Sequence, residues 1–373
     1  MGILRFLLAV SVVVMHCDGP LSTRFLVGGP FAVDLFFIIS GFYMALVLAE
    51  RYVGEGSTRV FYGNRLLRLL PTYYLVLAAS LLLPLLAGLI RGGSALFGQM
   101  VVWQMHGAHL PSPYGLLLGA IQITPFGQEL ASTATFDPVG ARVLQLRGED
   151  AYLPLFYFML IPPAWSLSLE LQFYAVAPFL ARRGVRVLMA VVLVACALRW
   201  VLPALPFGSP SFWTERALPC ALGYFGLGML SYRLYRKLRN KPGGVLARPE
   251  TGWIALGGLL TLLVVFPWLP EGLRRIGLVA ALAAGIPGVF AATCTLRWDR
   301  LIGELSYPIY MVHWLVKAFW YGVAARYRIV EGSRVFHVLV VVALSVLAAF
   351  LVHWVVERPI ERCRRRRVAR IPA

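Results

Sequence analysis

The chain has 373 residues, of which 59% are hydrophobic and only 14% are charged. Its mean hydropathy of +0.74 excludes an ordinary soluble domain and indicates a polytopic membrane protein. The net charge of +18 would suit a nucleic-acid-binding protein, but the uneven distribution of that charge along the chain argues against that class.

Ten apolar runs follow one another along the chain, each close to the ~20 residues that a membrane-spanning helix needs. They cover residues 3–17, 31–49, 69–90, 165–181, 187–205, 217–235, 251–270, 276–296, 301–325 and 335–356. We therefore predict an all-α membrane protein with about ten transmembrane helices, forming a single domain over residues 1–373. A cleavable signal peptide is not expected, because residues 1–17 lack a basic start and a small-residue cleavage site.

The first run contains RFLLAVSVVVMHC, with an arginine near one end and a histidine near the other. Ionisable groups inside a membrane helix are costly and point to a functional site. Eleven residues of α-helix make about three turns, so Arg5 and His16 lie on nearly the same face, about 16 Å apart along the axis. In the second run, Asp34 lies at the depth of His16, where the two side chains can pair. Ser40 and Gly41 of the same run are most simply explained by a close helix contact.

The third run begins with FYGNRLLRLLPTYY, in which Arg65 and Arg68 share one helix face. Guanidinium groups bind phosphate through a fork of donors, although this pair taken alone is better explained as an anchor at the cytoplasmic surface. Residues 92–164 then mix glycine, proline and polar residues with broken apolar stretches. We predict that they form one long loop, extracytoplasmic or partly re-entrant.

Two later runs carry further polar residues. Glu170 lies within AWSLSLELQFYAVAP, and an acid in such a segment rarely survives without a partner or a role. Trp165 of the same stretch suits an interfacial or packing aromatic residue better than a sugar platform. In ELSYPIYMVHW the residues Ser306, Tyr310 and His313 follow the i, i+4, i+7 spacing of one helix face, with His313 near mid-membrane. Taken alone, this histidine is equally well explained as a packing residue.

The positive charges are unevenly distributed between alternate loops. With the N-terminus in the cytoplasm, 22 of the 35 lysines and arginines lie in inner loops and the tail. This bias orients helices during insertion and predicts that both termini are cytoplasmic, provided that 92–164 crosses the membrane an even number of times or not at all. The basic cytoplasmic tail at 358–373 then needs anionic lipid headgroups and no nucleic acid as a partner. The five cysteines are odd in number and lie mostly in apolar runs, so we expect no disulfide framework and no metal site.

Several of these segments occur in an order that matches a known family. RFLLAVSVVVMH looks like the Arg-x10-His signature of the acyltransferase 3 family of integral membrane enzymes. The segments FAVDLFFIISGFYM, RLLRLLPTYY, WSLSLELQFYAVAP, LSYPIYMVHWLV and VERPIER resemble its further motifs, in the same order, so that the resemblance covers about residues 3–362. The chain departs from the family at Gly63 and Asn64, where relatives often carry basic residues before the paired arginines.

The resemblance implies transfer of an acyl group, usually acetyl, from cytoplasmic acyl-CoA to a hydroxyl, with acyl-CoA as a co-substrate and no permanently bound cofactor. The hydroxyl needs a base at the moment of attack, and His16 is the candidate, either as the base or as a transient acyl carrier. The remaining expected roles are orientation of His16 by Asp34 or Glu170, donor binding by Arg5, Arg65 and Arg68, and oxyanion or substrate contacts from His313, Tyr310, Ser306 and Trp165.

The resemblance also implies a bacterial cytoplasmic (inner) membrane and a carbohydrate or glycolipid acceptor: a surface polysaccharide, lipopolysaccharide or lipid-linked precursor. A small macrolide-like metabolite is the alternative acceptor. Relatives often carry a fused extracytoplasmic SGNH-type domain, which would here be a separate partner protein. A transporter or flippase would also show ten spans and buried charges, but transporters often contain internal repeats with broken helices, and the sequence shows no such repeat. An enzyme is therefore the favoured class.

Overall fold

The computed structural model describes residues 1–17, 19, 21–22, 24–91, 97–145, 152–204, 209–241, 244, 246, 248–329 and 334–371. The helices of this part are α1 (Gly2–His16), α2 (Gly29–Glu50), α3 (Ser57–Arg91), α4 (Gln99–His106), α5 (Ser112–Ile123), α6 (Trp165–Ala181), α7 (Val185–Val201), α8 (Leu218–Arg239), α9 (Pro249–Val265), α10 (Glu271–Thr293), α11 (Arg297–Arg326), α12 (Arg334–Val352) and α13 (Arg358–Ala369). The strands are β1 (Ala134–Asp137), β2 (Arg142–Gln145) and β3 (Leu153–Pro154).

Each predicted apolar run coincides for most of its length with one helix, namely α1, α2, α3 and α6 to α12. Within the described residues, six helices are long and apolar enough to cross a membrane: α2, α3, α7, α9, α10 and the continuous stretch formed by α12 and α13. At the other predicted positions, α1 and α6 are shorter, and α8 and α11 carry more charged residues. The fold is thus that of an all-α, multi-pass membrane protein, with one small sheet added.

The described residues of 92–164 form more regular structure than the predicted loop. In the part that the structure describes, α4, α5 and short 3₁₀ turns surround an antiparallel sheet with strand order β2-β1-β3. Ala134 of β1 pairs with Gln145, and Phe136 pairs with both Val143 and Leu153. A separate apolar cluster, which includes the fully buried Phe136, holds these elements together.

The end of α5 is fastened to the middle of α3. Tyr74 donates a hydrogen bond to the carbonyl of Ile123 (2.8 Å), and Tyr73 donates to the carbonyl of Gln122. Because these tyrosines lie about 25 Å along α3 from its first residue, α5 folds back beside the far half of that helix.

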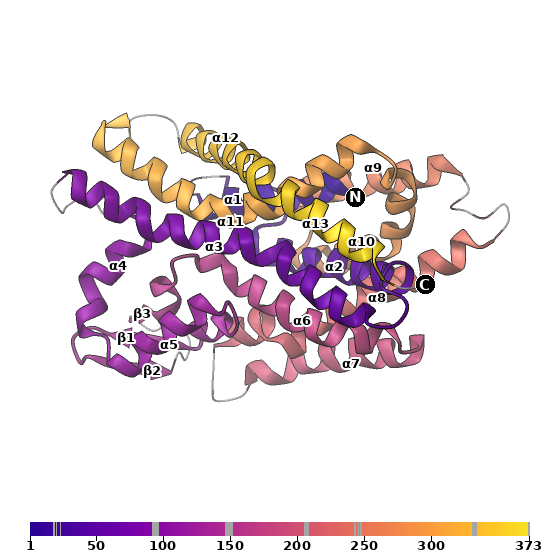
Figure 1. Cartoon of the computed structure of the whole chain (residues 1–373), viewed down its shortest axis with the longest axis horizontal. Coiled ribbons are helices and arrows are strands. Elements are labelled where there is room, and N and C mark those ends of the chain that lie inside the picture. The colour runs from indigo at the N-terminus through magenta and orange to yellow at the C-terminus, as the bar shows by residue number, and fades with distance from the viewer. Residues whose placement is uncertain are drawn as a thin grey trace.

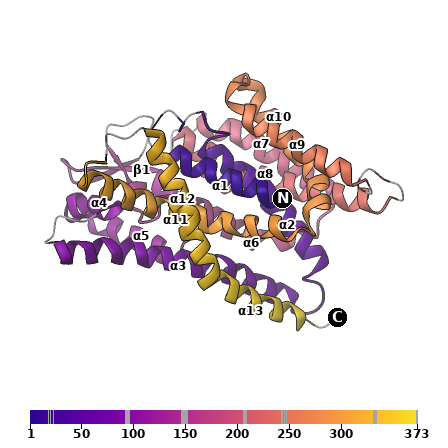
Figure 2. The same ribbon diagram turned by 90° about the horizontal axis from the view of Figure 1, so that it is seen from above.

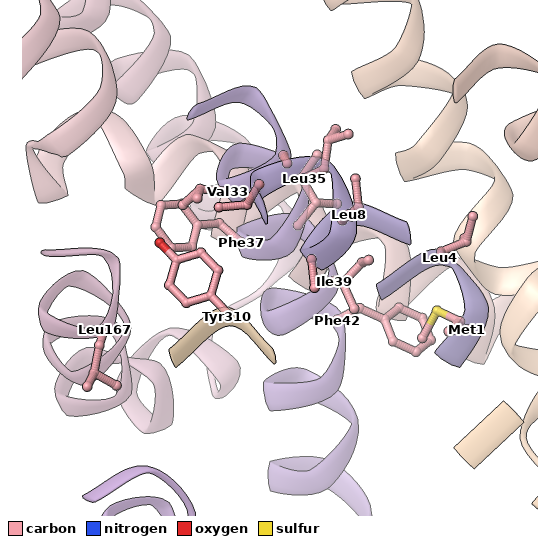
Figure 3. Close-up of a cluster of buried hydrophobic side chains, with 14 of the residues drawn as sticks. Met1, Leu4, Leu8, Val33, Leu35, Phe37, Ile39, Phe42, Leu167 and Tyr310 are labelled. Atoms are coloured by element: carbon pink, nitrogen blue, oxygen red, sulfur yellow. The ribbon is translucent and has the colours of Figure 1, made fainter. Parts of the chain in front are cut away.

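Helix α2 occupies the centre of the bundle, where small residues allow close contact. A Cβ on Gly41 would lie 2.0 Å from the carbonyl oxygen of Phe225, and one on Gly228 would lie 1.9 Å from the carbonyl oxygen of Ile38. The predicted close contact at Ser40 and Gly41 is confirmed, and α8 is the helix that makes it. Side chains from different faces of α2 fill the core, with Leu35 towards Leu8 of α1 (Figure 3) and Phe37 stacked on Phe225 of α8, with ring centroids 4.5 Å apart.

Helices α1 and α11 lie side by side and run in the same direction. At one end, a Cβ on Gly303 would meet the Cα of Gly2 at 2.7 Å, and the side chain of Asp299 accepts hydrogen bonds from the backbone N–H groups of Gly2 and Ile3 (2.8 and 3.0 Å). This backbone contact sets the register of the two helices. It places His16, at the other end of α1, beside the middle of α11.

The N-terminus and the end of α13 lie towards one end of the molecule, and the small sheet with α4 and α5 lies at the opposite end (Figures 1 and 2). We call these the inner and outer ends. The N-terminal part of α1, with Arg5, belongs to the inner end, whereas His16 lies towards the outer end.

Candidate active site

The centre of the candidate site is a pair of histidines. His16, the last residue of α1, and His313 of α11 stack with ring centroids 5.0 Å apart, and His16 Nδ1 lies 3.1 Å from His313 Nε2. His313 is fully buried, and its Nδ1 lies 2.7 Å from the carbonyl oxygen of Tyr310. Both histidines were predicted site residues, but their direct contact was not predicted.

These contacts fix the protons on both rings when the rings are neutral. A carbonyl oxygen only accepts, so the proton shared with Tyr310 belongs to His313 Nδ1. The Nε2 of His313 is then an acceptor, and His16 Nδ1 must donate to it. The remaining nitrogen, His16 Nε2, then carries the lone pair of the ring.

Aromatic and cationic side chains surround the pair, and the sequence reasoning missed several of them. The indole of Trp314 meets the ring of His16 edge-on at 5.1 Å, and Lys317 lies over Trp314, 5.3 Å from its centroid. Arg216 lies between the rings of Trp165 (5.1 Å) and Phe156 (5.2 Å). Both cations are within electrostatic range of His16. Helical spacing from His313 could have suggested Lys317, whereas Arg216 comes from a distant segment.

The predicted contact residues Tyr310, Trp165 and Ser306 differ in their surroundings. The Tyr310 hydroxyl donates to the carbonyl of Pro163 (3.0 Å) and accepts a hydrogen bond from Ser166 (2.8 Å), which ties α11 to the start of α6 beside Trp165. Ser306 instead donates to the carbonyl of Gly303 in its own helix (2.7 Å). Tyr310 therefore lies next to the histidine pair, and the hydroxyl of Ser306 serves its own helix.

The predicted pairing of Asp34 with His16 is wrong. Asp34 is buried and forms an ion pair with Arg199 of α7 (3.3 Å), whose guanidinium also lies over the ring of Tyr224, 5.0 Å from its centroid. The reason is helical geometry: Phe36, two residues later and about 200° around α2, is the residue that meets Tyr310. Asp34 therefore points to α7 and α8.

Glu170 lies in the inner half of the site. Within the described residues, none of its hydrogen bonds is to the histidine pair. Its carboxylate accepts hydrogen bonds from Ser40 (3.0 Å) and from Tyr174, one turn further along α6. It lies within electrostatic range of Arg5 and Arg68. The structure thus brings together two residues predicted to bind the donor and one predicted to be catalytic.

Arg65 has unusual surroundings for a charged residue. Its side chain is buried, with the guanidinium 5.6 Å from the centroid of Phe61, 5.8 Å from that of Tyr174 and Nη1 3.9 Å from Met44 Sδ. Its Nε has no hydrogen-bond partner within the described residues. A buried guanidinium without a carboxylate partner has donors left for a bound anion.

The described residues contain no group of three metal-ligand side chains. Their arrangement instead combines acid–base groups near the outer end with arginines near the inner end, inside a bundle of membrane helices. These features define an integral membrane protein with a candidate site for group transfer.

The comparisons identify the family. A family model described as an acyltransferase domain, that of the acyltransferase 3 family, matches residues 1–354, and the chain belongs to this family. The comparisons with curated proteins and with solved structures give no match. Membership indicates membrane acyl transfer to a hydroxyl group, and the predicted family is confirmed.

Proposed function

We propose that this protein transfers an acetyl group from cytoplasmic acetyl-CoA to a sugar hydroxyl of a surface polysaccharide, lipopolysaccharide or lipid-linked precursor, in a bacterial cytoplasmic membrane. The observation that carries the proposal is the hydrogen-bonded chain from His16 through His313 to the Tyr310 carbonyl. When both rings are neutral, this chain leaves the lone pair of the His16 ring at Nε2. Such a nitrogen is suited to accept the proton of an attacking hydroxyl.

In the proposed reaction the acceptor oxygen attacks the thioester carbonyl while His16 Nε2 takes its proton. The tetrahedral intermediate then collapses, the carbon–sulfur bond breaks, and His16 returns the proton to the departing CoA thiolate. His313 orients the base and shares the positive charge of the protonated ring, a role that carboxylates have in other acid–base pairs. Because both nitrogens of His313 are engaged, we assign it this positioning role in place of the predicted oxyanion contact.

Three arginines towards the inner end, Arg5, Arg65 and Arg68, form the proposed binding site for the acyl donor. Arg5 and His16 stand at opposite ends of α1, about 16 Å apart along its axis, so a donor held at Arg5, Arg65 and Arg68 can extend its pantetheine arm towards His16. Glu170 fixes this region by binding Ser40 and Tyr174 and by balancing the charges of Arg5 and Arg68. We therefore assign Glu170 to donor positioning. Asp34, paired with Arg199, has a structural role.

The same lone pair on His16 also suits a route through an acyl-histidine, in which Nε2 attacks the thioester first. The two routes differ when the acceptor is withheld. Direct transfer gives no labelled protein from radiolabelled acetyl-CoA, whereas the acyl-histidine route gives a stoichiometric burst of CoA and a labelled His16.

The experiment that tests the proposed function compares surface glycans from the wild-type strain and a deletion strain by mass spectrometry. We expect ester-linked acetyl groups to disappear on deletion and to return with the wild-type gene, but not with His16→Ala. Unchanged glycans together with a missing modification on a secreted small molecule would contradict the carbohydrate acceptor and leave the acyltransferase assignment in place.

A further inference from the structure

Helix α13, which begins at Arg358, lies beyond the part of the chain that the family model matches. It follows a π-helical turn at the end of α12 and packs antiparallel to the first turns of α3, at the inner end of the molecule (Figure 2). Asn64 of α3 fastens it there, because its amide donates to the backbone carbonyl of Arg364 (3.3 Å) and to the hydroxyl of Tyr52 (3.1 Å). The basic tail is therefore docked on the donor side of the bundle.

The docking brings two arginines of α13 to the paired arginines of α3. Arg364 is half-buried and lies within electrostatic range of both Arg65 and Arg68. Arg367 lies against α3 at Gly63, where a Cβ would come within 2.7 Å of its Nη2 atom. The glycine thus leaves the space that the guanidinium occupies. We call these four residues the inner arginine cluster.

The cluster carries more positive charge than its described carboxylates balance. Glu170, Glu357 and Glu361 lie within electrostatic range of Arg68, but Glu170 also serves Arg5. Glu361 accepts from Arg364 (2.6 Å) through one carboxylate oxygen and from Arg365 (3.0 Å) through the other. The Nε atoms of Arg65 and Arg364 are both buried without a hydrogen-bond partner within the described residues. Like charges gathered in a partly buried site repel one another, and a bound anion relieves this repulsion while satisfying the donors.

We propose that Arg364 and Arg367 form a subsite for the 3′-phosphate of the CoA donor, next to Arg65 and Arg68, which bind its diphosphate. This inference rests on the proposed function. In CoA the diphosphate lies between the pantetheine arm and the adenosine, so it enters deeper than the 3′-phosphate. Arg68 is the deepest member of the cluster along α3, and Arg367 lies at Gly63, nearer the inner surface. A terminal phosphate monoester carries close to two negative charges at neutral pH and matches two guanidinium groups.

The test measures binding of CoA and dephospho-CoA, which lacks the 3′-phosphate, to the full-length protein in phosphatidylcholine nanodiscs by calorimetry. We expect the double variant Arg364→Gln, Arg367→Gln to bind CoA about 10- to 100-fold more weakly, with dephospho-CoA affinity unchanged. Arg366→Gln is the matched control, because Arg366 is exposed on the same helix. It should bind both ligands as the wild type does.

A second variant keeps all charges and moves one of them. Gly63→Ala places a methyl group where Arg367 lies, and the flexible end of that side chain can move aside without unfolding α3. We expect a several-fold loss of the preference for CoA over dephospho-CoA and an unchanged melting temperature. An unchanged preference in this variant and in the double arginine variant would overturn the subsite and leave the proposed function intact.

Two further outcomes separate the sources of phosphate. If the double variant lost binding only to nanodiscs containing phosphatidylglycerol, with CoA affinity intact, the cluster would be a lipid headgroup site and the proposal would be wrong. If the wild type bound no CoA at all, the donor assignment itself would fail, and the subsite with it.

Discussion

Replacing His313 with leucine removes the acceptor that holds the Nδ1 proton of His16, 3.1 Å away. A buried donor left without a partner costs about 1–3 kcal/mol. Because this cost falls on the orientation and charge of the base in the transition state, we expect kcat to fall about 5- to 150-fold, with little change in KM for acetyl-CoA. His313→Gln should retain more activity than leucine, since its side-chain carbonyl can accept the same hydrogen bond.

The assay is acetyl transfer to the native glycan acceptor, measured as ester-linked acetate at varied acetyl-CoA concentration. His337→Leu is the control, because His337 is a buried histidine whose Nδ1 accepts from Trp320 Nε1 (3.1 Å) outside the histidine pair. It should lower the melting temperature and leave kcat per folded molecule unchanged. A positioning role for His313 is refuted if His313→Leu keeps kcat within twofold of the wild type, or if the loss in His313→Leu appears wholly in KM.

Three further predictions follow from other parts of the structure. Arg199→Leu leaves the buried carboxylate of Asp34 without its ion-pair partner and should lower the free energy of unfolding by about 3 kcal/mol. Adding Asp34→Leu to the same chain should restore part of this loss. Equal melting temperatures in the wild type, the single variant and the double variant would contradict this prediction. Replacing Arg65 and Arg68 with glutamine should weaken CoA binding about tenfold for each arginine, with lysine restoring it only in part, and unchanged affinity would make them topology anchors. Asp137 accepts hydrogen bonds from the backbone N–H of Gly140 and from the guanidinium of Arg142, and these bonds hold the pKa of its carboxyl below the usual range. The stabilisation that Asp137 gives to the β1–β2 hairpin is therefore present above the usual carboxyl pKa and is lost as the pH falls through the lowered pKa. Hydrogen exchange in the hairpin should therefore rise at acid pH in the wild type and be pH-independent, after correction for intrinsic exchange, in Asp137→Asn.

The helices could be located from the sequence because each membrane helix is a continuous apolar run whose length the bilayer sets. The sheet within 92–164 could not, since its strands have four, four and two residues and their pairing joins segments with weak alternation. The docking of α13 depends on contacts about 300 residues apart in the chain, between Asn64 and Arg364. Gly63 belongs to this contact because its missing side chain leaves room for Arg367.

The site was predictable in its residues and less so in their partners. Helical periodicity places His16, Arg5 and His313 on definite faces, but which helix each face meets depends on packing between distant segments. The contact of Gly2 with Gly303 brings α1 beside α11 and gives His16 a histidine partner. Asp34 was assigned by depth alone, and depth does not determine direction around a helix.

The most direct test of the central claim is the rate of acetyl transfer by His16→Gln, compared with His16→Ala and the wild type, at saturating acetyl-CoA. If His16 Nε2 takes the acceptor proton, both variants should lose about 10²- to 10⁴-fold in kcat, because glutamine has a similar size but no basic nitrogen. Expression, insertion and CoA affinity should remain close to wild type in both. Near-normal transfer by His16→Gln, with poor folding of His16→Ala, would instead show a packing histidine and contradict the account.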